Sequence, residues 1–171
     1  KLNVGVGGNL GTPALDLLDD ERQLYVLELS SFQLERAGKL GLAVAVVLNL
    51  SADHLDRHGN MPRYHQAKHR IFMGCSTAVA HSDDPLTVPL LEDSVPVVGW
   101  RLGEPALYGF GLRRDQGVEC LSHGFVLLMP VTELAMEGRH NVANALAALA
   151  LGHAAGLPLD AMLDSLRHFA G

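Results

Sequence analysis

The stretch at residues 24–29 reads LYVLEL, and a second stretch at residues 43–48 reads AVAVVL. Both are nearly continuous in apolar side chains, as is typical of strands that are covered on both faces in a parallel sheet. Each runs into a polar loop, and helical patterns follow. This order predicts an α/β fold with a doubly wound, mainly parallel sheet flanked by helices.

The remaining elements are predicted outward from these two strands. Between residues 104 and 136 the pattern changes to short alternating runs broken by glycine, which predicts a small antiparallel sheet with a hairpin turn at residues 122–124. The other predicted strands lie at residues 2–6, 78–80 and 95–98. Helices are predicted after Pro13 and at residues 53–58, 62–73, 86–91, 141–155 and 160–169.

Composition bounds the class of protein. The chain has 13 Lys and Arg against 19 Asp and Glu, a formal net charge of −6, whereas binding to nucleic acid needs clustered basic side chains. No apolar run approaches the ~20 residues of a membrane helix. Cys75 and Cys120 lack neighbouring cysteines, which predicts free thiols. We therefore expect a cytoplasmic chain without nucleic-acid or membrane partners. We also expect a monomer with one domain over residues 1–171, which contains an antiparallel insertion at about residues 104–136.

Glu28 lies at the carboxyl end of an otherwise apolar strand. A buried carboxylate needs a metal, a cation or backbone donors, and ligands of open α/β sheets bind at the carboxyl ends of strands. Ser30 follows at the same edge. The alternative is a carboxylate that caps the next helical turn or pairs with a surface lysine.

His54 stands in the loop NLSADHLD, residues 49–56, which follows the next strand. Imidazole beside carboxylates in such a loop suits a divalent metal. His54 and His58, like His65 and His69, also have the i, i+4 spacing of a zinc-binding helix. Neither pair has the glutamate of an HExxH motif or an evident third ligand, so zinc is the weaker alternative.

Two further stretches leave their alternatives open. Lys68 in YHQAKHRIF is either a lysine that reaches solvent along a helix or a partly desolvated amine, whose neutral form reacts with carbon dioxide. Asn141 suits a helix N-cap, and with Asn144 it can also contact a purine edge. The glycine-rich stretch GVGGNLG, residues 5–11, is by itself a weak signal for phosphate binding.

Several of these motifs occur together. They are GGNLG at residues 7–11, VLELSSFQLE at 26–35, NLSADHLDRHG at 49–59, Lys68, and GRHNVANALAA at 138–148. In this order and spacing the chain resembles the central ATPase domain of the Mur ligase family, and VLELSSFQLE is most similar to its D-glutamate-adding members. The resemblance covers essentially the whole chain.

The resemblance implies an ATP-dependent amide-bond ligase of peptidoglycan synthesis. ATP would phosphorylate the carboxylate of UDP-N-acetylmuramoyl-L-alanine, and D-glutamate would attack the acyl phosphate. Of two Mg²⁺ ions, Glu28 would hold one, and His54 with a carbamylated Lys68 would hold the other, which makes His54 and Lys68 the catalytic residues. His140, Asn141 and Asn144 would face the ATP base. The resemblance also implies that Asn9, Ser30 and Gln33 contact the muramoyl substrate.

The family's phosphate-binding loop, GxxxxGK[ST], has no match in the sequence. The resemblance therefore suggests a piece of a three-domain enzyme that lacks this loop and both outer domains. We expect this piece alone to fold and to be inactive. The alternatives are a catalytically silent domain, or another ligase of the same superfamily that acts on a folate or a different muramoyl peptide.

Overall fold

The computed structural model describes residues 2–170. The chain divides into two compact units, one of Lys1–Lys39 with Asp53–Arg70 and the other of Leu40–Ala52 with Ile71–Gly171. The mixed sheet with a parallel core and flanking helices confirms the predicted α/β class. The organisation of residues 1–171 as a single domain stays a prediction.

The first unit holds a two-stranded parallel sheet of β1 (Val4–Gly8) and β2 (Leu24–Glu28). The 3₁₀ helix η1 (Ala14–Leu17) connects them where an α-helix was predicted. Val6 and Val26 are register partners and are 65% and 52% exposed. The expectation that residues 24–29 form a strand covered on both faces, in one sheet with residues 43–48, is therefore wrong, because β2 pairs only with β1 among the described residues.

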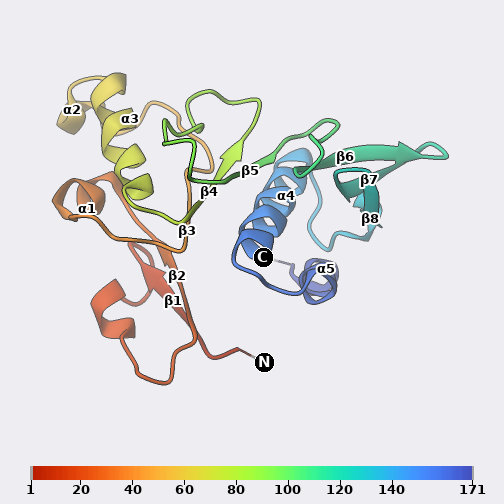
Figure 1. Cartoon of the computed structure of the whole chain (residues 1–171), viewed down its shortest axis with the longest axis horizontal. Coiled ribbons are helices and arrows are strands. Elements are labelled where there is room, and N and C mark those ends of the chain that lie inside the picture. Colours follow the sequence, from red (N-terminus) through yellow and green to blue (C-terminus); the bar gives the residue numbers. More distant parts are fainter. Residues whose placement is uncertain (1, 171) are drawn as a thin grey trace. The chain divides into compact units, whose positions relative to one another are not determined.

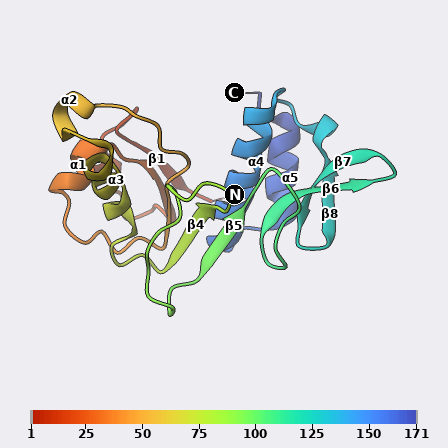
Figure 2. The same ribbon diagram turned by 90° about the horizontal axis from the view of Figure 1, so that it is seen from above.

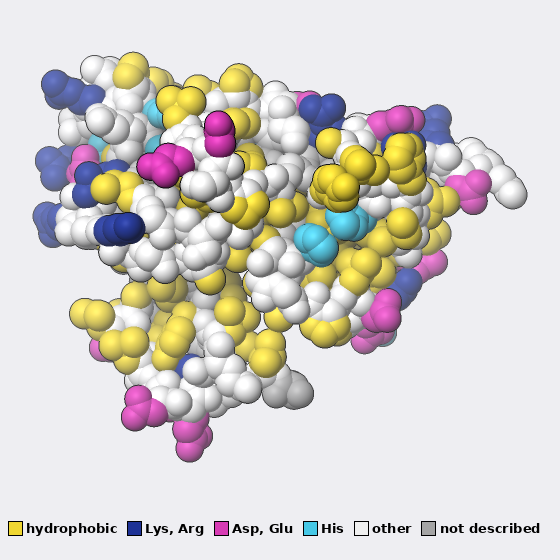
Figure 3. Space-filling view, viewed as in Figure 1, with side chains coloured by type: hydrophobic (Ala, Val, Ile, Leu, Met, Phe, Trp, Pro, Cys, Tyr) yellow, Lys and Arg dark blue, Asp and Glu magenta, His cyan; other side chains and the backbone are white. Residues whose placement is uncertain are grey.

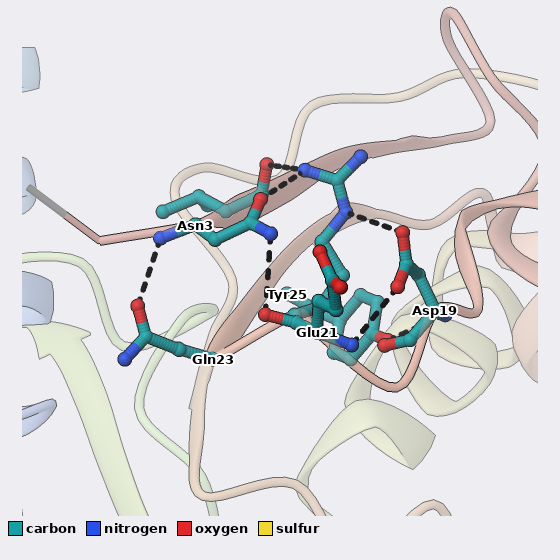
Figure 4. A network of polar contacts seen from close by, with 7 residues as sticks. Asn3, Asp19, Glu21, Gln23 and Tyr25 are labelled. Carbon is teal, nitrogen blue, oxygen red and sulfur yellow. Dashed lines mark hydrogen bonds and ion pairs between the residues drawn. The ribbon is translucent and has the colours of Figure 1, made fainter.

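Polar contacts fix the register of β1 and β2 at their amino ends (Figure 4). The backbone N–H of Asn3 donates to Gln23 Oε1 at 3.0 Å, and Arg22 Nη1 donates to Asn3 Oδ1 at 2.6 Å. Next to them, the Tyr25 hydroxyl donates to the Asp19 carbonyl at 3.0 Å. These bonds hold the loop before β2 against the start of β1, so Gly8 and Glu28 come to lie side by side at the far end.

Three helices of the first unit pack on one another, as Figures 1 and 2 both show. They are α1 (Ser31–Arg36), α2 (Leu55–His58) and α3 (Met61–His69), and the 3₁₀ turn η2 (Arg70–Phe72) extends α3. Asn60 caps α3 by accepting from the Arg63 N–H at 3.0 Å. The helices predicted at residues 53–58 and 62–73 are confirmed, although α2 starts two residues later, at Leu55, and α3 starts one residue earlier, directly after its cap.

The second unit holds a six-stranded sheet in the order β3-β4-β5-β6-β7-β8. The three pairs from β3 to β6 are parallel and the two pairs from β6 to β8 are antiparallel, so the predicted antiparallel strands continue the parallel sheet and do not form a sheet of their own. The turn at Gly124 confirms the hairpin expected there. The strands are β3 (Val44–Val46), β4 (Thr77–His81), β5 (Val97–Trp100), β6 (Phe110–Asp115), β7 (Val118–His123) and β8 (Val126–Pro130).

The helix predicted at residues 86–91 is wrong. Thr87 sits in a turn, where its N–H and its hydroxyl both donate to the Asp84 carbonyl, at 3.0 and 2.9 Å. Pro89 follows directly and cannot donate to a helical ladder. Local side-chain bonds therefore replace the helix in this segment.

The second unit buries its core beneath α4 (Arg139–Ala154), which packs along β3 to β6 and against α5 (Leu159–His168) (Figure 1). The helix predicted at residues 141–155 is confirmed, and most of its apolar side chains are buried. The centre of the core consists of side chains that are almost fully buried, namely Val79, Phe110, Leu121, Leu146 and Leu149. No helix among residues 2–170 is long and apolar enough to span a membrane. Cys75 and Cys120 are free and buried, as predicted.

His123 gives the second unit a dependence on pH. Its ring stacks on Phe110 with 4.5 Å between centroids, and burial together with nearby His153 lowers the pKa of His123 below 6.5, although a hydrogen bond to the Tyr108 backbone opposes this. The unfolded chain then binds more protons than the folded one, so the free energy of unfolding should fall as the pH drops below about 6.5. His123→Phe keeps the stacking and should flatten this slope in denaturant titrations from pH 7.5 to 5. An unchanged slope would contradict the assignment.

Candidate active site

The candidate site is built around the carboxyl ends of β1 and β2. Gly8 has a φ of 121°, which lets the chain turn sharply, and the N–H of Asn9 then donates to the Glu28 carbonyl at 2.6 Å. This bond places Asn9 and Glu28 at one edge, which the strand-end argument predicted for Glu28. The Glu28 side chain itself is exposed, so the expectation of a buried carboxylate is wrong. An exposed carboxylate at a strand end can take a cationic ligand without a large desolvation cost.

Ser30 and Gln33 form a capping box at the start of α1. The Gln33 N–H donates to Ser30 Oγ at 3.3 Å, and the Ser30 N–H donates to Gln33 Oε1 at 2.9 Å. Their side chains are therefore oriented by the helix start directly after β2. Both predicted substrate contacts lie at the predicted edge, and both have a structural role there.

Lys68 reaches the same edge from α3. Its Nζ donates to the Leu29 carbonyl at 3.4 Å, and the residue is half-buried. The helix thus carries the amine to the residue that follows Glu28. The amine therefore contacts a backbone carbonyl, and the choice between the two alternatives for this lysine stays a prediction.

His54 contacts α1 through the ring of Phe32. It precedes α2 in the left-handed conformation, with a φ of 49°, and its ring lies 5.1 Å from the Phe32 ring between centroids. Asp53 holds it, because Asp53 Oδ2 is 3.3 Å from His54 Nε2 and Asp53 Oδ1 accepts from the His54 N–H at 2.8 Å. A left-handed histidine is strained, and such strain is often found at functional sites.

Sequence reasoning missed the polar chain that joins α1 to α2. His58 Nε2 lies 2.9 Å from Ser31 Oγ, and His58 Nδ1 lies 3.3 Å from Glu35 Oε1. The ring also stacks on Phe32 with 5.4 Å between centroids. Ser31 and His58 are 2% and 4% exposed, so this pair is buried, whereas the Glu35 side chain is 38% exposed. The His58 ring supports Phe32, and Phe32 in turn contacts the His54 ring. The sequence did hold a signal for this pair, because Ser31 lies in the motif VLELSSFQLE and His58 lies in the motif NLSADHLDRHG, and both motifs also contain predicted site residues.

The donor chemistry fits magnesium better than zinc. Glu28 and Asp53 offer hard, exposed carboxylates, and Mg²⁺ is typically held by one or two carboxylates with substrate phosphates. Zinc needs at least three protein ligands. Within residues 2–170 no three His, Cys, Asp or Glu side chains are close enough together to hold a metal ion. His58 uses both ring nitrogens, and His65 stacks on His69 at 3.8 Å between centroids.

The residues predicted to face a nucleotide base lie in the second unit, on the first turn of α4. Asn141 is not the N-cap, because Gly138 takes that position with a φ of 101°, which suits glycine. Asn141 Nδ2 donates to the Glu137 carbonyl at 2.8 Å. His140 and Asn144 are exposed on the same turn. The helix start therefore groups these three side chains, as the sequence predicted.

Candidate ligand-binding side chains at the carboxyl ends of strands are the arrangement found in α/β proteins that bind ligands at this edge. The family model of the Mur ligase middle domain matches residues 9–152. The chain therefore belongs to the Mur ligase family, as its middle domain.

Curated relatives and a solved structure agree with this membership. UDP-N-acetylmuramoylalanine--D-glutamate ligase of Pseudomonas syringae pv. syringae (strain B728a) is 58% identical over 168 residues, which are 98% of this chain and 38% of that protein. The enzyme of the same name from Acinetobacter baylyi (strain ATCC 33305 / BD413 / ADP1) is 55% identical over 169 residues, again 98% and 38%. The chain thus spans less than half the length of these relatives.

The fold is also that of a crystal structure of UDP-N-acetylmuramate:L-alanyl-gamma-D-glutamyl-meso-diaminopimelate ligase from Neisseria meningitides. The TM-score is 0.67 at 19% identity, over 99% of this chain and 58% of that one. This similarity supports the α/β architecture of a mixed sheet with flanking helices.

Proposed function

We propose that this chain is the ATP-using part of a cytoplasmic, monomeric ligase that joins D-glutamate to UDP-N-acetylmuramoyl-L-alanine. The names of the relatives, at 58% and 55% identity, support this substrate pair. The observation that carries the catalytic assignment is the Lys68 Nζ to Leu29 carbonyl contact of 3.4 Å, which brings a lysine amine to the residue that directly follows Glu28.

The reaction has two steps. The terminal carboxylate of the muramoyl substrate takes the γ-phosphoryl group of ATP, and the amine of D-glutamate then attacks the acyl phosphate and releases phosphate. Two magnesium ions, when bound, would neutralise the phosphate charge that develops in the first step. Glu28 would hold the ion at the β- and γ-phosphates, and His54 would hold the second one near the acceptor.

Lys68 would contribute as a carbamate. Its neutral amine takes up carbon dioxide and loses a proton, which turns the end of a long side chain into a carboxylate ligand for the second ion. The Leu29 carbonyl, 3.4 Å from Nζ, would hold this side chain at the end of β2. His54 would stay in place through its contacts with Phe32 and Asp53.

The proposed contacts with the substrate and with the nucleotide come from different elements. Asn9, Ser30 and Gln33 would bind the muramoyl substrate from the strand end and the capping box. His140, Asn141 and Asn144 would bind the adenine base from the first turn of α4. The capping box keeps Ser30 and Gln33 in a single orientation, which lowers the entropy lost on binding.

The test is a coupled assay of the intact ligase that contains this chain, with ATP, Mg²⁺ and UDP-N-acetylmuramoyl-L-alanine. D-glutamate should give one phosphate per amide product, and L-glutamate should give little product. The same assay on the chain alone should give no product. Preference for L-glutamate or for a folate substrate would overturn the proposed specificity, and the absence of any ATP-dependent ligation would overturn the function.

A further inference from the structure

The first unit contains a pocket of about 370 Å³ that the proposed reaction does not use. It lies among α1, α2 and the continuous helical stretch of α3 and η2. Its lining side chains are mostly charged or polar, and they are Glu35, Arg57, His58, Arg63, Gln66, Ala67 and Arg70. Glu28, His54 and Lys68 do not line it, so it is separate from the candidate catalytic residues.

Helical periodicity explains this separation. Arg63, Gln66, Ala67 and Arg70 are spaced by three, one and three residues, which places them on one face of the helical stretch. Lys68 does not share this face, and its amine contacts the Leu29 carbonyl. One side of α3 thus contacts the end of β2, and the other side lines the pocket.

Positive charge prevails in the pocket. Three guanidinium groups line it, against the single carboxylate of Glu35, which lies 3.3 Å from His58 Nδ1. Figure 3 shows Lys and Arg side chains gathered over α1 and α2, in the part of the first unit that holds the pocket. The excess of two positive charges, in a chain whose net charge is −6, marks this pocket as a place for an anion.

The arginines are oriented before any ligand arrives. Arg70 Nε and Nη2 donate to the carbonyls of Leu34 and Ala37 at 2.7 and 2.9 Å, which fixes the plane of its guanidinium group. The guanidinium carbon of Arg57 lies 6.0 Å from the centre of the Phe32 ring. Contacts of this kind reduce the side-chain entropy that binding would otherwise cost.

Gly59 lies next to the third arginine. Its φ of 82° terminates α2, and Arg63 Nη1 is the nearest atom that a side chain at position 59 would meet, at 3.8 Å. The Arg63 guanidinium therefore lies beside the end of α2, the helix that carries Arg57. Gln66 adds an amide to the same face of α3.

We propose that this pocket binds the dianionic phosphoryl group of a small ligand, with Arg57 and Arg63 as its main hydrogen-bond donors. A phosphate monoester carries about −1.5 to −2 charges at neutral pH, which matches the excess positive charge. Guanidinium groups bind phosphate oxygens with two parallel hydrogen bonds. The volume exceeds that of one phosphate, so either free phosphate or a phosphorylated organic molecule fits. This site is additional to the proposed ligase function.

The test is calorimetric titration of the purified chain with inorganic phosphate, and separately with D-glucose 6-phosphate, in metal-free buffer at constant ionic strength. One site per chain is expected. Arg57→Gln and Arg63→Gln should each weaken binding by about tenfold, because each removes a charge-assisted pair of hydrogen bonds. Arg36→Gln is the matched control, since Arg36 lies in the last turn of α1 and does not line the pocket. Its binding should change by less than roughly twofold.

Folding of each variant is checked by circular dichroism, and Arg63→Lys serves as a second variant that keeps the charge and loses the paired hydrogen bonds. Tighter binding of inorganic phosphate would identify free phosphate as the ligand, and tighter binding of D-glucose 6-phosphate would identify a phosphorylated organic molecule. Either outcome supports the proposed site. Absence of saturable binding, or equal weakening by Arg36→Gln, would overturn it. Because no nucleotide or magnesium is present, failure here leaves the ligase assay unaffected.

Discussion

Lys68→Ala should lower the turnover of the ligase that contains this chain by about three orders of magnitude, as expected when a group that positions transition-state charge is removed. Alanine cannot take up carbon dioxide, so added bicarbonate should not restore activity. A small carboxylic acid can replace the missing ligand in part. Added acetate should therefore recover some turnover, measured as phosphate release at saturating ATP.

The matched control is Lys39→Ala, because Lys39 is exposed in the segment after α1 and belongs to the same unit. It should have near-normal turnover with and without acetate. Near-normal turnover of Lys68→Ala in the absence of added acid would rule out the carbamate role. Lys68 would then be a lysine whose contact with the Leu29 carbonyl is structural.

Gly8→Ala should destabilise the first unit by about 3 kcal/mol and abolish most of the ligase activity. A Cβ at position 8 would overlap the carbonyl oxygen of Glu28, and the φ of 121° is one that alanine rarely adopts. Relief of this overlap requires β1 and β2 to separate at their carboxyl ends. The bond from the Asn9 N–H to the Glu28 carbonyl would be lost, and both predicted ligand-binding residues would move.

The measurement is hydrogen exchange at the amides of β1 and β2, together with the midpoint of urea unfolding. Gly38→Ala is the control, because nothing lies within 4 Å of a Cβ there and its backbone is outside the left-handed region. It should be neutral or slightly stabilising. Protection of the β1 and β2 amides at the wild-type level in Gly8→Ala would show that this glycine is not required for the geometry of the site.

Local pattern was sufficient for much of the fold. The buried helix α4, the hairpin at Gly124 and the amphipathic α5 follow from periodicity and turn residues within short windows. The same reasoning placed Glu28 and Ser30 at a strand end, which the structure confirms. It failed for residues 86–91, where Thr87 bonds to the Asp84 carbonyl and the apolar content suggested a helix.

The sequence by itself determined most of the helices and strands and which polar residues fall at their ends, because these properties depend on neighbours a few positions apart. Only the tertiary structure decided that β1 and β2 form a separate sheet and that Glu28 is exposed. It also decided that His58 joins Ser31 to Glu35 and that three arginines line one pocket. Such pairings join residues far apart in the chain, and their free energy depends on packing and desolvation that no local pattern encodes.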